Sequence, residues 1–203
     1  MAIGAAICSL AGIIGFTGLT AFTGTHRPTS ALKVAVAGNA DIKVLGTSNL
    51  HNWTMEAKNI TCSAKFNFGP GNGNEPKSLT ELNLTVPVKD LKSGESSMDS
   101  RAYTALKAKT FTDISFSLTS ATIVPGQKDH FLIKGAGNLS IAGVTKPVSM
   151  DVNCQVSTDG LITCTGSEKL KMTDYQIKPP TFMLGAFKTG NDLTINFTLV
   201  VKK

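Results

Sequence analysis

GAGNLSIAGVTKPVSMDVNCQVSTDGLITC, residues 135–164, is the stretch that decides the fold. Every second residue in most of it is apolar: Leu139, Ile141, Val148, Met150, Val152, Cys154 and Val156. A period of two is typical of strands with one dry face and one wet face. Gly143 and Pro147 frame a first reversal of the chain. Asp159-Gly160 makes a second. The stretch therefore predicts three consecutive antiparallel strands.

Two cysteines flank the second reversal. If residues 158–160 form a three-residue loop, Ser157 faces Leu161 and Cys154 faces Cys164 in the closer, non-hydrogen-bonded kind of pair. Such a pair forms a disulfide in an oxidising compartment, or packs as two small hydrophobes on the buried face, and the sequence leaves both open. Cys62 lies on another apolar face and is predicted to be a buried free thiol.

The same alternation recurs along the chain, over residues 41–46, 51–57, 60–68, 82–88, 114–118, 131–133 and 193–201. Residues 92–110 break it and have helical spacing, so they predict one short helix beginning near Ser96, with Ser97 or Asp99 as its cap. Residues 69–77 and 178–185 are loops by their Gly and Pro content. Many antiparallel strands with one apolar face favour a closed barrel, although a two-sheet sandwich would show the same pattern.

Composition narrows the class of protein. The 203 residues are 41% hydrophobic and 17% charged, which suits one folded domain. The net charge of +6 comes from dispersed lysines, with Arg27 and Arg101 the only arginines. Since no basic run with interleaved aromatics occurs, nucleic acid is not an expected partner. A weak attraction to anionic membrane surfaces is left open.

The first 25 residues carry no charge, and residues 2–22 are mostly apolar. We interpret residues 1–37 as an export leader with its linker, and residues 38–203 as the barrel domain. The predicted location is periplasmic or secreted, with residues 2–22 long enough to act as an uncleaved membrane anchor. The alternative is that they form a buried hairpin or helix of the domain.

Chemical motifs are sparse. The three histidines, His26, His51 and His130, have no second ligand at metal-binding spacing, so no metal is expected. Nucleophile-elbow, phosphate-loop and dinucleotide motifs are absent, so the sequence predicts neither catalysis nor a cofactor. Trp53 is interpreted as core or as a plug at a barrel end, with the wall of a ligand site as the functional alternative. Flexible thioethers in or beside irregular segments would suit an adaptable opening: Met98, Met172 and Met183.

Several of these blocks resemble the YceI-like family, the lipocalin-like polyisoprenoid-binding proteins of the bacterial periplasm. The signature hairpin is GAGNLSIAGVTKPV at residues 135–148. Further blocks are GTSNLHNWTM at 46–55, DLKSGESSMDSRAYTALKA at 90–108, FTDISFSL at 111–118 and GSEKLKMTDYQIKPPTFMLGAFKTGNDLTINFTLVV at 166–201. The resemblance covers residues 40–201, and its later blocks are similar to the branch common in Bacteroidetes-type bacteria.

The resemblance implies an all-β fold, an extended eight-stranded antiparallel lipocalin-like barrel with one short helix in a crossing connection near one mouth. Its lumen would bind a polyisoprenoid or another long-chain amphiphilic lipid for carriage or storage, without chemistry. Two rivals remain, an isoprenoid-modifying enzyme on the same barrel and a structural barrel with no ligand. Lys169, Lys171, Lys178 and Lys188 are expected near a head group at the mouth. The expected lumen residues are the inward apolar positions Trp53, Met55, Phe66, Leu84, Val86, Phe116, Leu118, Phe131, Ile133, Ile141, Met150, Val152, Ile195 and Phe197.

Overall fold

The computed structural model describes residues 31–35, for which only the backbone is considered, and residues 40–69 and 76–202. The described elements, in chain order, are β1 (Ala31–Ala35), β2 (Asp41–Ser48), β3 (Trp53–Ala57), β4 (Thr61–Phe68), β5 (Pro76–Pro87), η1 (Val88–Asp90), α1 (Ser96–Ala105), β6 (Asp113–Pro125), β7 (His130–Ile141), β8 (Val144–Val156), β9 (Leu161–Lys171), η2 (Met172–Tyr175), β10 (Thr181–Phe182) and β11 (Phe187–Lys202).

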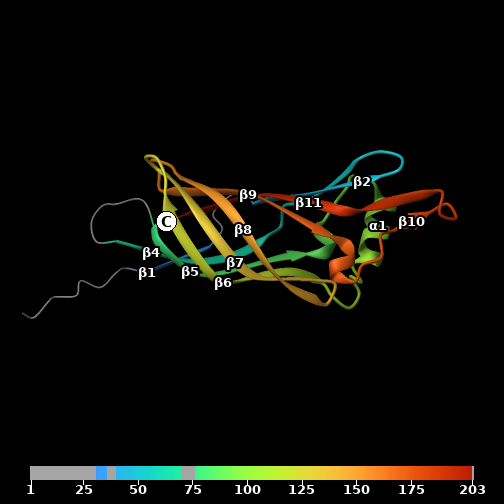
Figure 1. Cartoon of the computed structure of the whole chain (residues 1–203), viewed down its shortest axis with the longest axis horizontal. Coiled ribbons are helices and arrows are strands. Elements are labelled where there is room, and N and C mark those ends of the chain that lie inside the picture. Colours follow the sequence, from blue (N-terminus) through green and yellow to red (C-terminus); the bar gives the residue numbers. More distant parts are fainter. Residues whose placement is uncertain (1–30, 36–39, 70–75, 203) are drawn as a thin grey trace, which may run out of the picture.

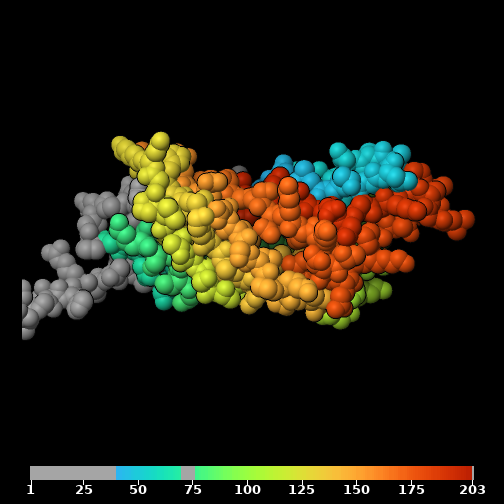
Figure 2. Space-filling view, viewed as in Figure 1, coloured from blue at the N-terminus to red at the C-terminus, as the bar shows by residue number. Residues whose placement is uncertain are grey.

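One antiparallel sheet contains all of these strands. Its order is β1-β4-β5-β6-β7-β8-β9-β11-β2-β3, with the short β10 paired to β11. The sheet curls on itself into a long barrel, with α1 and β10 at one end and the turns after β6 and β8 at the other (Figure 1). The outline in Figure 2 is correspondingly elongated. This single curled sheet confirms the all-β barrel over the sandwich.

The strand count differs from the expected eight. Eight strands have eight residues or more, and they correspond to the predicted barrel: β2, β4, β5, β6, β7, β8, β9 and β11. Three short strands add to them, namely β1, β3 and β10. β3 is separated from β2 by a turn in which the Ser48 hydroxyl oxygen accepts from the N–H groups of Leu50 and His51. The gap between the alternating runs at residues 41–46 and 51–57 agrees with this turn.

β1 lies within the predicted linker. Residues 31–35 pair with residues 63–67 of β4, so the segment assigned to residues 1–37 contributes an edge strand to the sheet. The apolar residues 2–22 lie outside the described part of the chain, as do residues 70–75 of the predicted loop. The export leader therefore stays a prediction.

The β7–β8 reversal is tighter than expected. Ile141 pairs with Val144, and the two loop residues Ala142 and Gly143 both have positive φ, 51° and 84°. This is the two-residue hairpin geometry that follows the twist of the sheet. Pro147, predicted to frame the turn, lies inside β8 opposite Asn138. Proline is tolerated there because this part of β8 pairs with β7, whereas β9 pairs only with residues 152–156 of β8.

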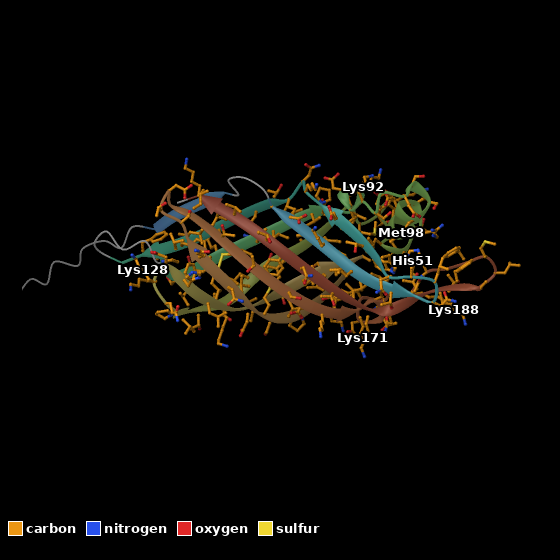
Figure 3. The ribbon with its side chains drawn as sticks, turned by 90° about the horizontal axis from the view of Figure 1, so that it is seen from above. His51, Lys92, Met98, Lys128, Lys171 and Lys188 are labelled. Carbon is orange, nitrogen blue, oxygen red and sulfur yellow. A yellow bond between two sulfur atoms is a disulfide. The ribbon has the colours of Figure 1, made fainter. Side chains whose placement is uncertain are left out.

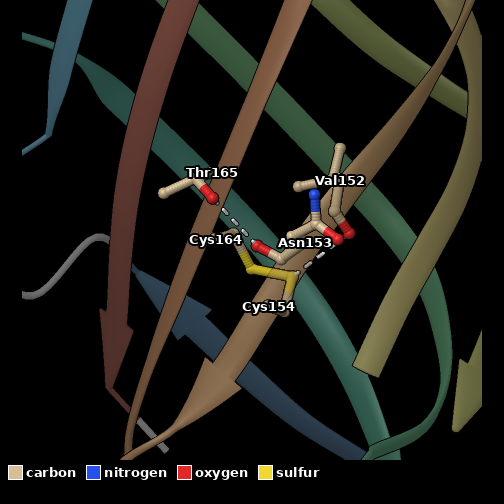
Figure 4. The surroundings of a disulfide bond; sticks show 5 residues. All are labelled: Val152, Asn153, Cys154, Cys164 and Thr165. Atoms are coloured by element: carbon tan, nitrogen blue, oxygen red, sulfur yellow. Dashed lines mark hydrogen bonds between the residues drawn. A yellow bond between two sulfur atoms is a disulfide. The ribbon is translucent and has the colours of Figure 1, made fainter. Parts of the chain in front are cut away.

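The β8–β9 hairpin matches the prediction. Cys154 pairs with Cys164, their Cα atoms are 4.2 Å apart, and their sulfurs form a disulfide that joins the two strands (Figure 4). The disulfide decides between the two interpretations left open above. Cys62 is a buried free thiol, as predicted, and burial raises its pKa to about 11.

α1 begins where the sequence places it, but its cap is different. Glu95 is the N-cap residue and makes no capping bond with its side chain. Asp99, predicted as a cap, is buried and accepts hydrogen bonds from the backbone N–H and hydroxyl of Ser93. The Tyr103 hydroxyl lies 2.9 Å from the carbonyl oxygens of Lys89 and Leu91. These bonds hold the helix against the chain that leaves η1.

Candidate functional site

The middle of the barrel contains an apolar inner cavity of about 160 Å³. Most of its lining residues lie on the long strands, and Leu91 lies between η1 and α1. The cavity brings together the predicted lumen residues Phe66, Leu84, Val86, Phe116, Leu118, Ile133, Ile141, Met150, Val152, Ile195 and Phe197. It also contains residues that the prediction did not include, among them Leu79, Leu82, Leu91, Ile114 and Leu139.

Inward-facing glycines shape this cavity. Gly135 is among the lining residues, and a Cβ added to it would meet nothing closer than Leu118 Cδ1 at 3.7 Å. Gly166 is different, because a Cβ there would collide with the ring of Phe197, which lies over it from β11. One glycine thus leaves free volume in the lumen, while another makes room for an aromatic ring.

A larger mouth cavity of about 510 Å³ lies at the end of the barrel under α1 and β10. Trp53 and Met55 line it, as do Met98 and Met172, two of the three methionines predicted at an opening. Phe131 lines neither cavity and packs in a core cluster with Phe66 and Cys154. The mouth cavity adjoins the inner one, because both are lined by Val44, Leu91, Ile114, Ile141 and Ile195.

Trp53 forms part of the mouth wall. Its indole Nε1–H donates to the Thr47 carbonyl at 3.0 Å, so its polar atom is satisfied while its ring covers Gly46. His51 lies in the same wall, with Nδ1 2.7 Å from the Asn52 carbonyl. An indole anchored at its polar edge and apolar on its face is suited to contact an apolar ligand.

The barrel wall contains a seam between β8 and β9. These strands pair only where residues 152–156 meet residues 162–166. Beyond that point, η2 and Ile177, two residues after it, pack against the wall. Met172, Tyr175 and Ile177 are buried in one cluster with Val148, Met150 and Leu170. The sequence does not predict this closure, because residues 166–177 carry no break in alternation strong enough to mark it.

Glu168 is the carboxylate that lines the inner cavity, where the free thiol of Cys62 also lies. Its carboxylate has no hydrogen bond or ion pair with any residue that the structure describes, and burial raises its pKa. Burial also raises the pKa of Tyr175, with smaller contributions from the charges of Glu168 and Asp174. Sequence reasoning missed Glu168, although it follows Cys164 and Gly166 at the same spacing of two.

The predicted head-group lysines all have exposed side chains, and they do not line either cavity: Lys169, Lys171, Lys178 and Lys188. Figure 3 shows Lys171 and Lys188 toward the end that carries Met98 and His51, and Lys128 at the opposite end. Among the described residues, no group of His, Cys, Asp and Glu has the arrangement of a metal site. No helix in this part of the chain is long and apolar enough to cross a membrane.

Comparison with known proteins gives a family. The YceI-like domain matches residues 22–201. No curated protein matches the sequence. Among solved structures, BcnA of Burkholderia cenocepacia is 16% identical with a TM-score of 0.61, over 79% of this chain and 95% of that one.

Two further structures have the same fold. A polyisoprenoid-binding domain from Saccharophagus degradans is 14% identical with a TM-score of 0.60, over 84% of this chain and 97% of that one. The YceI protein of Campylobacter jejuni is 21% identical with a TM-score of 0.50, over 70% and 81%. At these identities the likeness shows the fold; similarity to the Bacteroidetes-type branch stays a prediction.

Proposed function

Because the chain belongs to the YceI-like domain family, we propose that it binds a polyisoprenoid or a similar long-chain amphiphilic lipid in its lumen, for carriage or storage. The observation that carries this proposal is the pair of adjoining cavities with mostly apolar walls along the barrel. Burying an apolar chain there gains roughly 25 cal/mol per Å² of apolar surface, before the costs of association. A long, flexible, apolar molecule fits this shape better than a compact polar one.

The proposed role is binding without chemistry. Glu168 lines the inner cavity and Tyr175 the adjoining mouth cavity, and the charge of Glu168 contributes to the raised pKa of Tyr175 without a hydrogen bond between them. An isoprenoid-modifying enzyme would use this pair, so it is the specific rival. Glu168→Gln and Tyr175→Phe should leave the bound lipid chemically unchanged from that of the wild type, and a different product in either variant would favour the enzyme.

We also propose an oxidising location, either periplasmic or secreted. Support comes from the Cys154–Cys164 disulfide, since such bonds persist in exported proteins, and from the apolar residues 2–22 of the sequence. Cell fractionation combined with alkylation of free thiols would test this. The expected result is an exported chain with both cysteines protected; a cytoplasmic chain with both alkylated would contradict it.

Solvent extraction tests the ligand. The purified chain is extracted with organic solvent, and the extract is analysed by mass spectrometry. We expect a long-chain isoprenoid or related lipid from the wild type, and loss of that lipid from Phe197→Asp, which introduces a charge into the apolar inner cavity. Val124→Asp is the matched control, because Val124 is exposed and lines neither cavity.

The structural barrel with no ligand gives a different result. In that case no lipid is recovered from the wild type, and Phe197→Ala lowers the free energy of unfolding by about 3–5 kcal/mol whether or not the sample has been stripped with solvent. A lumen that holds lipid predicts a smaller loss in the stripped protein.

A further inference from the structure

The β10–β11 hairpin carries two large apolar side chains into solvent. Met183 is 69% exposed and Leu184 fully exposed, more than any other large hydrophobic residue that the structure describes. Both have left-handed backbone, with φ of 51° and 55°, followed by Gly185 at 88°. Left-handed backbone is unfavourable for such residues, so neither local conformation nor burial within this chain explains them.

The hairpin is nevertheless held firmly. The rings of Phe182 and Phe187 stack with centroids 4.5 Å apart, and the Arg101 guanidinium of α1 lies 4.6 Å from the Phe182 centroid. The Asn49 side chain donates to the Ala186 carbonyl and accepts from the Lys188 N–H. These contacts tie the hairpin to α1 and to the β2–β3 turn, so its apolar tip has a defined position.

A second apolar tip lies beside it. Leu50, in the turn fixed by Asn49, is 59% exposed. Leu50, Phe182 and Arg101 all line the mouth cavity, so the exposed tips border the opening of the lumen. Figure 1 shows the β10–β11 hairpin extending beyond the end of the barrel near α1.

Cations without an ion pair to the described residues lie near these tips. Arg101 contacts Phe182, Lys188 lies at this end in Figure 3, and Lys178 is two residues before Pro180, which lines the mouth cavity. Glu95 lines the same cavity from the start of α1 and is the acidic group there. Protruding Leu and Met side chains flanked by Lys and Arg are typical of surfaces that insert into the interface of anionic membranes.

We propose that Leu50, Met183, Leu184, Arg101, Lys178 and Lys188, the mouth patch, dock on an anionic lipid bilayer. The tips enter the interface, the cations meet lipid head groups, and the mouth cavity then faces the membrane. Loading of the ligand from the bilayer rests on the proposed function, whereas docking on the bilayer does not depend on that function. A bilayer suits two separate protruding tips better than a protein partner, which needs a broad complementary face.

Brominated lipids test the position of the tip. In the full chain, Leu184→Trp is compared with Val124→Trp, an exposed residue at the end of β6 away from the mouth, and with the wild type, whose only tryptophan is Trp53. With vesicles of brominated phosphatidylglycerol, we expect the Leu184→Trp chain to show blue-shifted and quenched emission beyond the wild-type signal, and the Val124→Trp chain to show no such addition. This readout is specific to each position, so an anchor at residues 2–22 does not produce it.

Two lysine variants test how much the mouth-patch cations contribute to membrane binding. In the Leu184→Trp chain, Lys188→Gln removes a mouth-patch cation, and Lys128→Gln removes one from the opposite end (Figure 3). A lysine near an anionic surface contributes about a fivefold change in partition. We expect Lys188→Gln to raise the vesicle concentration needed for half-maximal quenching by about that factor, and Lys128→Gln to leave it unchanged.

Each of the following outcomes contradicts either a part of the docking proposal or the proposed function. Equal quenching in the Leu184→Trp and Val124→Trp chains, or none in the Leu184→Trp chain, overturns membrane docking and leaves a protein as the occupant of the patch. Equal effects of Lys188→Gln and Lys128→Gln overturn the role of the patch cations. If lipid is extracted from the lumen but the tip stays in water, docking fails while the lipid-binding function stands. If the tip is quenched and no lipid is recovered, the proposed function fails and docking stands.

Discussion

Glu168 places an ionisable group against an apolar cavity, and its raised pKa makes a prediction about stability. Below the unfolded-state pKa of about 4.3, both states hold the proton and the raised pKa has no effect. As the pH rises through the folded-state pKa, the carboxylate is disfavoured in the native state and stability is lost. We expect Glu168→Gln to raise the thermal midpoint relative to wild type at pH 7, with little difference at pH 3.5.

A surface carboxylate provides the control for that experiment. Glu81→Gln removes one partner of the exposed Lys65–Glu81 pair, which is worth little to stability. Scanning calorimetry at both pH values measures the midpoints. An equal midpoint for Glu168→Gln and wild type at pH 7 would show that the native state tolerates this carboxylate without cost.

Two inward glycines give a matched prediction about the lumen. Gly166→Ala would drive a methyl group into the Phe197 ring, and such overpacking costs about 1–3 kcal/mol of unfolding free energy. Gly135→Ala meets only ordinary contacts, so we expect a neutral or slightly stabilising effect. Urea denaturation of the two variants measures both values, and equal destabilisation would contradict the assignment of free volume to Gly135.

Single residues also show how far alternation can predict a site. A period of two says which side chains share a face, and Phe116, Ile195 and Phe197, chosen in this way, line the inner cavity; their contact with a ligand stays a prediction. It does not say how high along the barrel a residue lies, so it did not separate Phe131, in a packed cluster, from the cavity residues. It also favours a charged residue on the wet face, which is why Glu168 was overlooked.

The β8–β9 hairpin leads to a prediction at the scale of elements. Its disulfide closes a short loop, with a sequence separation of 10, and a loop of this size gives about 2–3 kcal/mol of stabilisation. Adding reductant should therefore lower the guanidinium midpoint of the wild type. The Cys154→Ala/Cys164→Ala double variant should start lower and show no effect of reductant.

Cys62→Ala is the control for thiol chemistry, because Cys62 is the free buried cysteine of the described chain. This variant should keep the full response to reductant. A double variant that still responds would mean that the response does not come from this disulfide.

The same two strands mark the limit of sequence reasoning about elements. The register near the turn follows from local chemistry, since the turn residues and loop length set which cysteine faces which. The separation of β8 from β9 further along depends on Tyr175 and its neighbours packing between strands. That is a tertiary contact, and a local pattern does not encode it. By contrast, the turn at residues 49–52 that separates β2 from β3 agrees with the gap between the runs 41–46 and 51–57, and bonds of the Ser48 hydroxyl hold it.

At the scale of the whole molecule, the family resemblance distinguished a barrel from a sandwich, which periodicity could not do. Alternation was equally compatible with a barrel and a sandwich, whereas the recurring blocks at residues 46–55 and 135–148 favoured the barrel that the structure has. The resemblance also implied a mouth near the short helix, and the structure adds the β10–β11 hairpin to that end. The contact of Arg101 with Phe182 joins α1 to this hairpin, a tertiary contact that neither periodicity nor the resemblance predicts.

The last prediction concerns whether the barrel needs the residues that precede residue 38. Residues 31–35 pair with β4 at the edge of the sheet, while the eight long strands lie between residues 41 and 202. A chain that begins at Gly38 therefore keeps every long strand and loses β1. We expect it to show the same β-rich circular dichroism as a chain that begins at Thr29, with a lower melting midpoint because five residues of β4 lose their partner and leave an exposed edge. Thermal melts of the two shortened chains measure the difference in melting midpoint, and light scattering detects association through that edge.

Equal midpoints would mean that β1 adds nothing to the stability of the barrel. Loss of cooperative melting in the chain from Gly38 would mean that the domain begins before residue 38.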